Sequence, residues 1–553
     1  MPRRPFTRLP ILLVASGLAL GWGIGGYRLL DPDEGRNAEV AREMLASRDF
    51  VVPRLDGLPY LDKPVLYFAA EAVSMAALGA TELAARLPAY LFTLGSLVLV
   101  VWFARKRWGP EAGWIAGIAL ATMPLTLAYA RTAIFDSTLS FFITAAIVAI
   151  VEDHPVTGWV ALALGTITKG PVALAVALAT LLPWALLTGR PLKRVLPLRG
   201  IAAFLVAGLP WFVAVTLRHP EFPHYAFVRE TFQRVTTRSF HRTAPFWYYL
   251  PILPVAAFPW IVPALSRLSR WREAWRARRV DPAAGEAVLL ACWVLGPLAF
   301  FTLNQSKLPQ YVLPLMPAFA LAAARVLARD GITAGWRAHA IAAAVAGALL
   351  VSLTRWLPAP LSLTGAERAA IPPAALALGL TALASAAVVA YAAWRDRPSL
   401  GILGYAAIVI AIPLAGGRLL QAVGEDRSSA SITETTAALL AETRGQVLGV
   451  AAYPTSLPFY LRHPIDVASE TGNELTSNYV ADYQDTFRAQ PGSPLKPADY
   501  WRGVFAGCPV PTVFITRAND HPARTTLGAS LPLLAEDTHY AAYGPCRPAA
   551  VDR

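Results

Sequence analysis

The chain has 553 residues, of which 55% are hydrophobic and 15% charged, and its formal net charge is +13. Soluble domains carry about 25% charged residues and single cores stop growing near ~250–300 residues, so this composition excludes an ordinary soluble enzyme, a disordered chain and a fibrous protein. It indicates a polytopic membrane protein, and three cysteines exclude a disulfide-rich scaffold.

The positive charge is unevenly distributed along the chain. Of 49 Lys and Arg and 36 Asp and Glu, residues 421–553 hold 10 and 14, which leaves 39 and 22 for residues 1–420, a net charge of +17 there. These bases cluster between apolar runs, near residues 3–8, 105–107, 190–199, 267–279, 325–337 and 395–397. Such clusters are typical of cytoplasmic loops of membrane proteins, so we expect no nucleic-acid partner.

Thirteen apolar runs predict transmembrane helices, since about 20 apolar residues span a bilayer and helices satisfy the backbone there. They lie near residues 8–29, 83–104, 111–128, 133–151, 157–168, 171–188, 200–217, 247–266, 285–304, 308–328, 337–357, 372–394 and 399–418. The first resembles a signal peptide without a convincing cleavage site, so we expect an uncleaved anchor. The run 65–80 is short, and we expect it to lie in the outer interface or to dip back.

Placing each basic cluster in the cytoplasm puts loops 31–64 and 218–246 on the outer face, together with everything after residue 420 or so. The predicted fold is an all-α membrane domain at 1–420, with about 13 transmembrane helices, and a small α/β domain at 421–553. In the second domain, β-like runs occur at 447–452 and 512–516.

The cysteines divide between the two predicted domains. Cys508 and Cys546 lie outside the membrane, where a disulfide is permitted, and the alternative is two unpaired thiols. Cys292 lies inside a predicted span, where packing explains it.

The first outer loop, residues 31–64, holds eight acids. In a structural interpretation Asp31 is the N-cap of a helix, Pro32 takes its first position and Glu34 completes a capping box. In a functional interpretation one acid caps the helix while its neighbour faces a site, and Asp33 and Arg36 share a helical face.

Lysine is rare in this chain, and three of the six lysines fall on the predicted outer face: Lys63, Lys169 and Lys307. Charges at membrane depth are costly and usually functional. Lys63 can instead be a snorkelling anchor, and residues 168–171 a plain turn. Asp136, at the outer start of a span, can be a charge favoured by the helix dipole.

The second outer loop, residues 218–246, alternates aromatic and basic side chains, among them Arg234 and His241. Aromatic residues form interfacial belts, but a basic loop on the outer face suits lipid phosphates. Tyr311 enters a span at the same level. A leaving lipid phosphate needs cations rather than a proton donor, and a carboxylate can orient an acceptor or take its proton. The sequence therefore predicts group transfer from a lipid phosphate, and it contains no P-loop, GxGxxG or zinc-ligand spacing.

The motifs in this region resemble those of the lipid A 4-amino-4-deoxy-L-arabinose transferase (ArnT) family, bacterial relatives of the protein O-mannosyltransferases within the GT-C glycosyltransferases. The similar segments are Asp33-Glu34-x-Arg36-x-Ala38-Glu39, Val52 to Gly57, Asp62-Lys63-Pro64, Thr168-Lys169-Gly170, Phe227 to Arg234, Pro245 to Tyr249 and Lys307-Leu308-Pro309-x-Tyr311. They cover most of residues 25–320.

The resemblance implies an inverting glycosyltransferase of the bacterial inner membrane that takes a sugar from undecaprenyl phosphate on the periplasmic face. Asp33 and Asp136 match catalytic acids of the family. The donor phosphate would be held by Lys63, Arg36, Lys307 and Tyr311. Candidates for substrate binding are Glu34, Asp62, Lys169, Arg234 and His241. Asn37 and Asp62 stand where the family usually has Tyr and Glu, which leaves the aminoarabinose specificity open.

The expected partners are membrane lipids, the undecaprenyl-phosphate sugar and an acceptor, with lipid A first and protein or another envelope glycan as the alternative. We expect a monomer, and a divalent metal remains open. A non-catalytic lipid or sugar transporter is the competing class. It predicts charges through the depth of the spans and an internal repeat, neither of which the sequence has.

Overall fold

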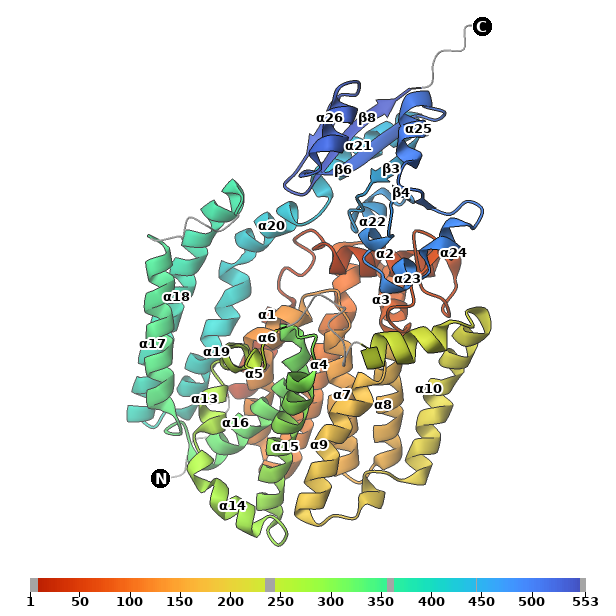
Figure 1. Cartoon of the computed structure of the whole chain (residues 1–553). Coiled ribbons are helices and arrows are strands. Elements are labelled where there is room, and N and C mark those ends of the chain that lie inside the picture. Colours follow the sequence, from red (N-terminus) through yellow and green to blue (C-terminus); the bar gives the residue numbers. More distant parts are fainter. Residues whose placement is uncertain (1–7, 234–243, 356–362, 444, 548–553) are drawn as a thin grey trace. The chain divides into compact units, whose positions relative to one another are not determined.

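The computed structural model describes residues 8–233, 244–355, 363–443 and 445–547 (Figure 1). The chain forms two compact units. The helical unit comprises Met1–Ile24 and Pro88–Leu419, and the mixed unit comprises Gly25–Leu87 and Leu420–Arg553. The first loop thus belongs to the same compact unit as the C-terminal region, whereas the sequence suggested a boundary at residue 420 alone.

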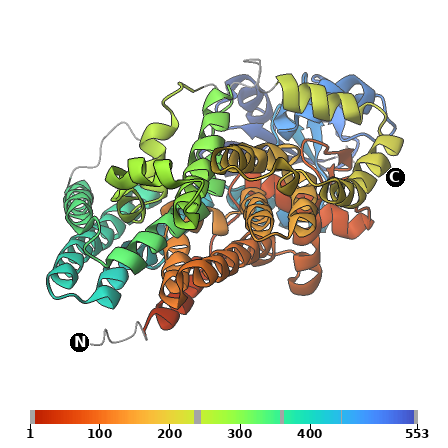
Figure 2. The same cartoon turned by 90° about the horizontal axis from the view of Figure 1, so that it is seen from below.

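The helical unit is a bundle of apolar helices, seen nearly end-on in Figure 2. Its α-helices are α1 (Leu9–Gly21), α4 (Glu82–Trp108, which begins in the mixed unit), α5 (Pro110–Ala121), α6 (Pro124–Ala130), α7 (Asp136–Val151), α8 (Pro155–Lys169), α9 (Val172–Thr188), α10 (Leu198–Arg218), α12 (Tyr249–Ala256), α13 (Ile261–Leu265), α14 (Trp271–Ala277), α15 (Pro282–Leu303), α16 (Met316–Asp330), α17 (Trp336–Leu353), α18 (Gly365–Trp394) and α19 (Pro398–Ala415). Shorter turns are η1 (Leu192–Arg194), η2 (His224–Gln233, a π-helix), η3 (Leu268–Arg270) and η4 (Pro309–Leu315).

Each of the thirteen predicted spans coincides with a helix or a pair of consecutive helices in the described residues. Among the described residues, seven helices are long and apolar enough to cross a membrane by themselves, or up to nine if each of two bent pairs is one span. The α5–α6 pair bends by 65° at Pro124, because a proline disfavours helical backbone in the residue before it. The chain is a multi-pass membrane protein, and the number of thirteen crossings stays a prediction.

The mixed unit contains a six-stranded sheet in the order β5-β4-β3-β6-β8-β7. Its strands are β3 (Gln446–Val450), β4 (Asp466–Ala468), β5 (Leu495–Lys496), β6 (Thr512–Arg517), β7 (Leu533–Glu536) and β8 (Tyr540–Cys546). Strands β5, β4, β3 and β6 are parallel, and β8 and β7 add antiparallel pairs. The central strands β3 and β6 are the two predicted runs, since strands covered on both faces are continuously apolar. The α/β fold of this region is confirmed.

The remaining elements of the mixed unit surround the sheet or belong to the first loop. They are α2 (Asp33–Ser47), β1 (Arg54–Leu55), β2 (Leu58–Pro59), α3 (Leu66–Leu78), α20 (Gly417–Asp426, which begins in the helical unit), α21 (Ala430–Thr443), α22 (Leu457–Leu461), η5 (Asn473–Leu475), α23 (Asn478–Asp482), α24 (Gln484–Arg488), α25 (Tyr500–Gly507) and α26 (His521–Gly528). Helix α2 packs against α3 and α22, so the first loop and the C-terminal region share one core.

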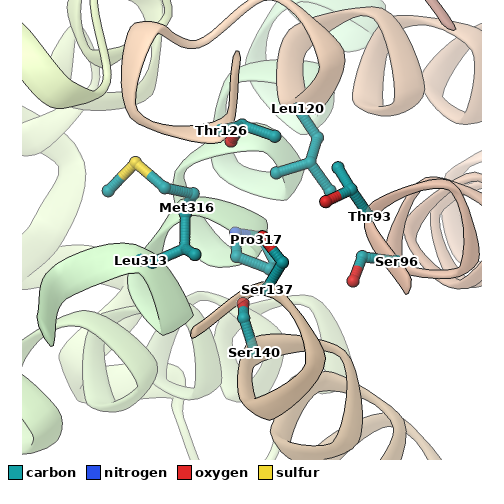
Figure 3. Close-up of a pocket in the computed structure, with 9 residues that line it drawn as sticks. All are labelled: Thr93, Ser96, Leu120, Thr126, Ser137, Ser140, Leu313, Met316 and Pro317. Atoms are coloured by element: carbon teal, nitrogen blue, oxygen red, sulfur yellow. The ribbon is translucent and has the colours of Figure 1, made fainter. Parts of the chain in front are cut away.

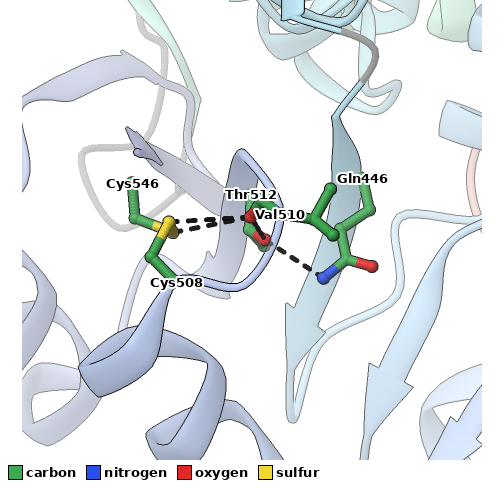
Figure 4. Close-up of a disulfide and its surroundings, with 5 residues drawn as sticks. All are labelled: Gln446, Cys508, Val510, Thr512 and Cys546. Carbon is green, nitrogen blue, oxygen red and sulfur yellow. Dashed lines mark hydrogen bonds between the residues drawn. A yellow bond between two sulfur atoms is a disulfide. The ribbon is translucent and has the colours of Figure 1, made fainter. Parts of the chain in front are cut away.

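Cys508, which follows α25, and Cys546, at the end of β8, form a disulfide (Figure 4). Both lie in the buried cluster around Leu448 and Phe514. The pairing alternative left open by the sequence is therefore the correct one. Cys292 is buried and unpaired, as expected for a packing role.

Candidate active site

Asp33 is the first residue of α2, and its carboxylate is 52% exposed. Arg36, one turn later, donates from Nη2 to Asp33 Oδ1 at 2.6 Å, which confirms that the two residues share a helical face. The Arg36 side chain is only 10% exposed and lies over the Tyr60 ring. Burial lowers the pKa of Arg36, but the neighbouring Tyr60, Asp33 and Asp62 raise it above its ordinary value. In this pair the exposed carboxylate of Asp33 is held by the buried guanidinium of Arg36.

Glu34 has the opposite environment to its neighbour Asp33. Its side chain is 1% exposed and accepts hydrogen bonds from Arg86 at 2.9 and 2.7 Å. It also accepts from the Leu30 backbone N–H at 2.9 Å. The structure argues against the predicted role of Glu34 in substrate binding, because its carboxylate holds Arg86 and the start of α2.

Asp31 is not the N-cap of α2, as the structural interpretation had it. The N-cap is Pro32, which makes no side-chain cap. The Asp31 carboxylate instead accepts from the hydroxyls of Thr455 (2.7 Å) and Ser456 (2.9 Å). The local pattern of Asp, Pro and Glu was misleading because the partners of Asp31 lie more than 400 residues away.

Asp62 and Lys63 follow the β1–β2 hairpin. Asp62 is 8% exposed and accepts from the Ser477 hydroxyl and from the backbone N–H groups of Asn478 (3.0 Å) and Tyr479 (3.3 Å). Lys63 is half-buried and donates from Nζ to the Asp62 carbonyl at 2.6 Å. Asp62 therefore acts as a structural support next to Lys63, which argues against its own predicted contact with substrate.

A second group of predicted residues meets in the helical unit. Lys169, the last residue of α8, donates to Asp136, the first residue of α7, at 2.6 Å. Its Nζ also lies 5.3 Å from the centre of the Tyr311 ring. The Lys169 and Asp136 side chains are 14% and 5% exposed, so this is a shielded ion pair with an aromatic wall.

Lys307 is also buried in the helical unit, but its contacts are with the backbone. Its Nζ donates to the carbonyls of Asn304 (2.6 Å) and Ala244 (3.1 Å). These contacts hold the approach to η4, the turn that carries Tyr311. Arg234 and His241 lie outside the described residues, and their predicted roles stay predictions.

A small cavity, which the sequence did not reveal, lies inside the helical unit (Figure 3). Its hydroxyl-bearing residues are Thr93, Ser96, Thr126, Ser137 and Ser140. The Thr126 hydroxyl is buried and has no hydrogen-bond partner in the described residues. The cavity measures about 10 Å³, room for one water molecule and far too little for a sugar.

One group among the described residues could hold a metal ion by geometry: Glu39, Glu43 and Asp56, whose oxygens lie within 4.8 Å of one another. Arg42 already neutralises Glu39 with two hydrogen bonds of 2.7 and 2.6 Å. Burial and the charge of Glu39 raise the pKa of Glu43 to about 7. Arg42 and a retained proton account for this cluster, and we assign no metal to it.

Two groups of predicted site residues thus meet in the described part of a multi-pass membrane protein, one in the mixed unit and one in the helical unit. Residues 35–226 match the family model described as dolichyl-phosphate-mannose-protein mannosyltransferase. The crystal structure of ArnT from Cupriavidus metallidurans bound to undecaprenyl phosphate covers 98% of this chain and 98% of that chain, with a TM-score of 0.82 and 24% sequence identity. The chain thus has the fold of this ArnT structure, in agreement with the resemblance drawn from the motifs.

Curated relatives agree with this placement. The chain is 33% identical over 329 residues to the undecaprenyl phosphate-alpha-4-amino-4-deoxy-L-arabinose arabinosyl transferase of Aeromonas salmonicida, which covers 56% of this chain and 59% of the relative. It is 35% identical over 311 residues to arabinosyl transferase 1 of Sodalis glossinidius, which covers 54% of each. The chain thus spans between half and two thirds of the length of these relatives.

Proposed function

We propose that this protein is an integral-membrane glycosyltransferase that moves a sugar from undecaprenyl phosphate to an acceptor on the periplasmic face of the inner membrane. The relatives named above carry this donor and an arabinosyl transfer in their names. Lipid A is the proposed acceptor, with aminoarabinose as the first sugar to test.

The observation that carries the proposal is the exposed carboxylate of Asp33 on the buried cation Arg36. In the reaction an acceptor oxygen attacks the anomeric carbon, and the bond from that carbon to the phosphate oxygen of the donor breaks. The electron pair stays on the leaving phosphate, which gains negative charge. Arg36 and Lys63 supply the cations that stabilise this charge, so no proton donor is required.

The role of Asp33 depends on the acceptor. A lipid A phosphate is already ionised at neutral pH, so Asp33 orients the acceptor and need not remove a proton. A hydroxyl acceptor on a protein or another glycan requires a base, and Asp33 then takes its proton. Asp33→Asn therefore leaves residual transfer to a phosphate and abolishes transfer to a hydroxyl.

Lys307, Tyr311 and the Asp136–Lys169 pair belong to the same proposal. In the helical unit Lys169 donates a hydrogen bond to Asp136 and packs on the Tyr311 ring. We propose that Asp136 takes part in catalysis and that Lys307 and Tyr311 contact the donor phosphate. Lys169 sets the positions of Asp136 and Tyr311.

The test is transfer from synthetic undecaprenyl-phosphate sugars by the protein purified in lipid nanodiscs. Asp33→Asn and Lys63→Ala should each lower transfer at least about a hundredfold, since one stabilising group at a reacting centre contributes on that order. Asp485→Asn, a change at an exposed carboxylate paired with Arg488, is the matched control. Wild-type transfer by both site variants would overturn the site.

The identity of the sugar and acceptor is read separately. Mass spectrometry of lipid A and of envelope glycans, with and without the gene, should show the loss of one defined sugar. An unchanged set of glycans would overturn the proposed function.

A further inference from the structure

The C-terminal region of the mixed unit forms hydrogen bonds with the first loop at Arg36 and at Asp62, which precedes Lys63. Arg36 and Lys63 are the cations of the proposed reaction. Resting on the proposed function, we propose that the segment Thr476–Tyr479 is a positioning element of the active site. It fixes Arg36 through Thr476 and fixes the backbone of Lys63 through Ser477 and Asp62. The C-terminal domain thereby takes part in binding the donor phosphate without touching it.

The contact with Arg36 is made by both acceptors of Thr476. Arg36 Nη1 donates to the Thr476 hydroxyl at 3.0 Å and to the Thr476 carbonyl at 3.3 Å. The other terminal nitrogen, Nη2, donates to Asp33. One planar guanidinium therefore links the C-terminal segment to the exposed carboxylate, and its two ends fix its orientation.

The backbone of Thr476 is held in an unfavourable conformation at this contact. Its φ is +52°, in the left-handed region that β-branched residues rarely adopt. Thr476 is exposed, so packing of its side chain does not demand a threonine there. The conformation is the one in which its carbonyl and its hydroxyl both reach Arg36.

The next residue supports Lys63 in the same way. The Ser477 hydroxyl and the backbone N–H groups of Asn478 and Tyr479 converge on the buried Asp62 carboxylate. Lys63 follows Asp62 in the chain and donates to its carbonyl. Because the Asp62 carboxylate is satisfied by three donors from one segment, movement of that segment displaces the backbone that carries Lys63.

Four consecutive residues thus hold two cations that are 27 positions apart in the loop. A scaffold that served stability alone would require no particular relation to Arg36 and Lys63. The contacts of this segment with Arg36 and with Asp62 assign Thr476 and Ser477 as positioning residues.

Substitution of Thr476 by glycine separates positioning from stability. Thr476→Gly removes the hydroxyl acceptor and relieves the left-handed backbone, so the melting temperature should stay the same or rise. The affinity for undecaprenyl phosphate, measured by native mass spectrometry, should fall about tenfold, the size expected for a lost hydrogen bond to a charged group. Thr476→Ser keeps the hydroxyl and should bind as the wild type does.

Ser477→Ala provides the second arm. It should raise KM for the undecaprenyl-phosphate sugar about tenfold with a smaller change in kcat, and Ser477→Thr should restore KM. Ser431→Ala is the matched control, since the Ser431 hydroxyl also donates to a carboxylate, that of Asp537, in an exposed part of the same unit. It should leave KM unchanged.

The outcomes distinguish this inference from the proposed function. Weaker undecaprenyl phosphate binding in Thr476→Gly and Ser477→Ala, together with an absence of sugar transfer by the wild type, would retain the positioning role and overturn the proposed function. Wild-type binding and KM in both variants would overturn the positioning role even if transfer is observed. A wild type that does not bind undecaprenyl phosphate would overturn both.

Discussion

Two neighbouring acids at the start of α2, Asp33 and Glu34, have opposite environments. Asp33 is exposed beside Arg36, whereas Glu34 is enclosed with Arg86. Arg86 also donates to the carbonyls of Tyr27 and Arg28 and lies 3.7 Å from the centre of the Tyr27 ring. The buried pair therefore ties the residues before α2 to the start of α4.

Removal of one partner of this pair should be strongly destabilising. Arg86→Ala leaves the buried Glu34 charge uncompensated, and we expect a loss of about 3–5 kcal/mol in unfolding free energy. The double variant Glu34→Gln, Arg86→Met should recover part of that loss, because neither side chain is then charged. Melting curves in detergent check both. A single variant as stable as the wild type would contradict the structural role.

The burial of Asp31 makes the free energy of unfolding depend on pH. Burial raises its pKa to about 7 from 3.8 in spite of the hydrogen bonds from Thr455 and Ser456. The folded state therefore binds more protons than the unfolded state between these two values. The free energy of unfolding should fall as the pH rises from about 4 to about 7 and then level off.

Asp31→Asn removes this titration and isolates its effect. The melting temperature of the wild type, measured relative to that of Asp31→Asn, should decline from about pH 5 to about pH 7 and stay constant to about pH 8. Other groups, including Glu43, titrate in both proteins and cancel in the difference. A constant difference across this range would show that Asp31 does not titrate there.

At the scale of elements, the contact between α2 and α22 depends on a glycine. A Cβ on Gly35 would lie 2.6 Å from the Ser456 backbone nitrogen and 2.3 Å from Asp31 Oδ1. A backbone atom cannot move aside as a flexible side chain can. Gly35 therefore allows α2 to approach the C-terminal region closely enough for Asp31 to reach Ser456.

Gly35→Ala should lower the melting temperature and the transfer rate together, since overpacking costs about 1–3 kcal/mol and displaces α2 with Asp33. The control is Gly503→Ala in α25, where a Cβ would meet nothing within 4 Å. That change should stabilise by up to about 1 kcal/mol, because alanine favours helix over glycine. Equal effects of the two substitutions would contradict the close approach.

At the scale of the whole molecule, the ion pair between Asp136 and Lys169 bears on the membrane topology. Asp136 begins α7 and Lys169 ends α8, so their contact places these two helix ends at one level. Helix α8 therefore extends over the same depth as α7, although it is one of the shorter helices. This supports α8 as a crossing, although its predicted apolar run, 157–168, is shorter than the stretch of about 20 residues that spans a bilayer.

Reporter fusions test this assignment. Alkaline phosphatase fused after Gly170 should be active and after Gly189 inactive, because the first position is predicted outside and the second inside. A fusion within residues 421–553 should be active. The reverse pattern at Gly170 and Gly189 would remove α8 from the crossings and change the parity of the later spans.

The sequence predicts what depends on local pattern and misses what depends on distant partners. Apolar runs located the helices, the spacing of Asp33 and Arg36 indicated their shared helical face, and short β-like runs located β3 and β6. The short strands β4 and β5 carry too few residues for a pattern, and none of the edge strands was predicted.

The buried contacts at the site have the same character. Arg86, which holds Glu34, lies 52 positions away from it, and Ser477, which holds Asp62, lies 415 positions away. Serine and threonine hydroxyls occur throughout any chain, so no spacing marks the few that bind a particular carboxylate. Such contacts are visible only once the chain is folded.

The hydrogen bonds between the first loop and the C-terminal region also set an order of assembly. The partners of Asp31, Arg36 and Asp62 are synthesised more than 400 residues after them. At ribosomal rates of about 5–20 residues per second, the loop waits for on the order of tens of seconds before its contacts exist. Under the proposed function, we therefore expect a nascent chain to remain inactive until the C-terminal region has been synthesised and has joined the first loop.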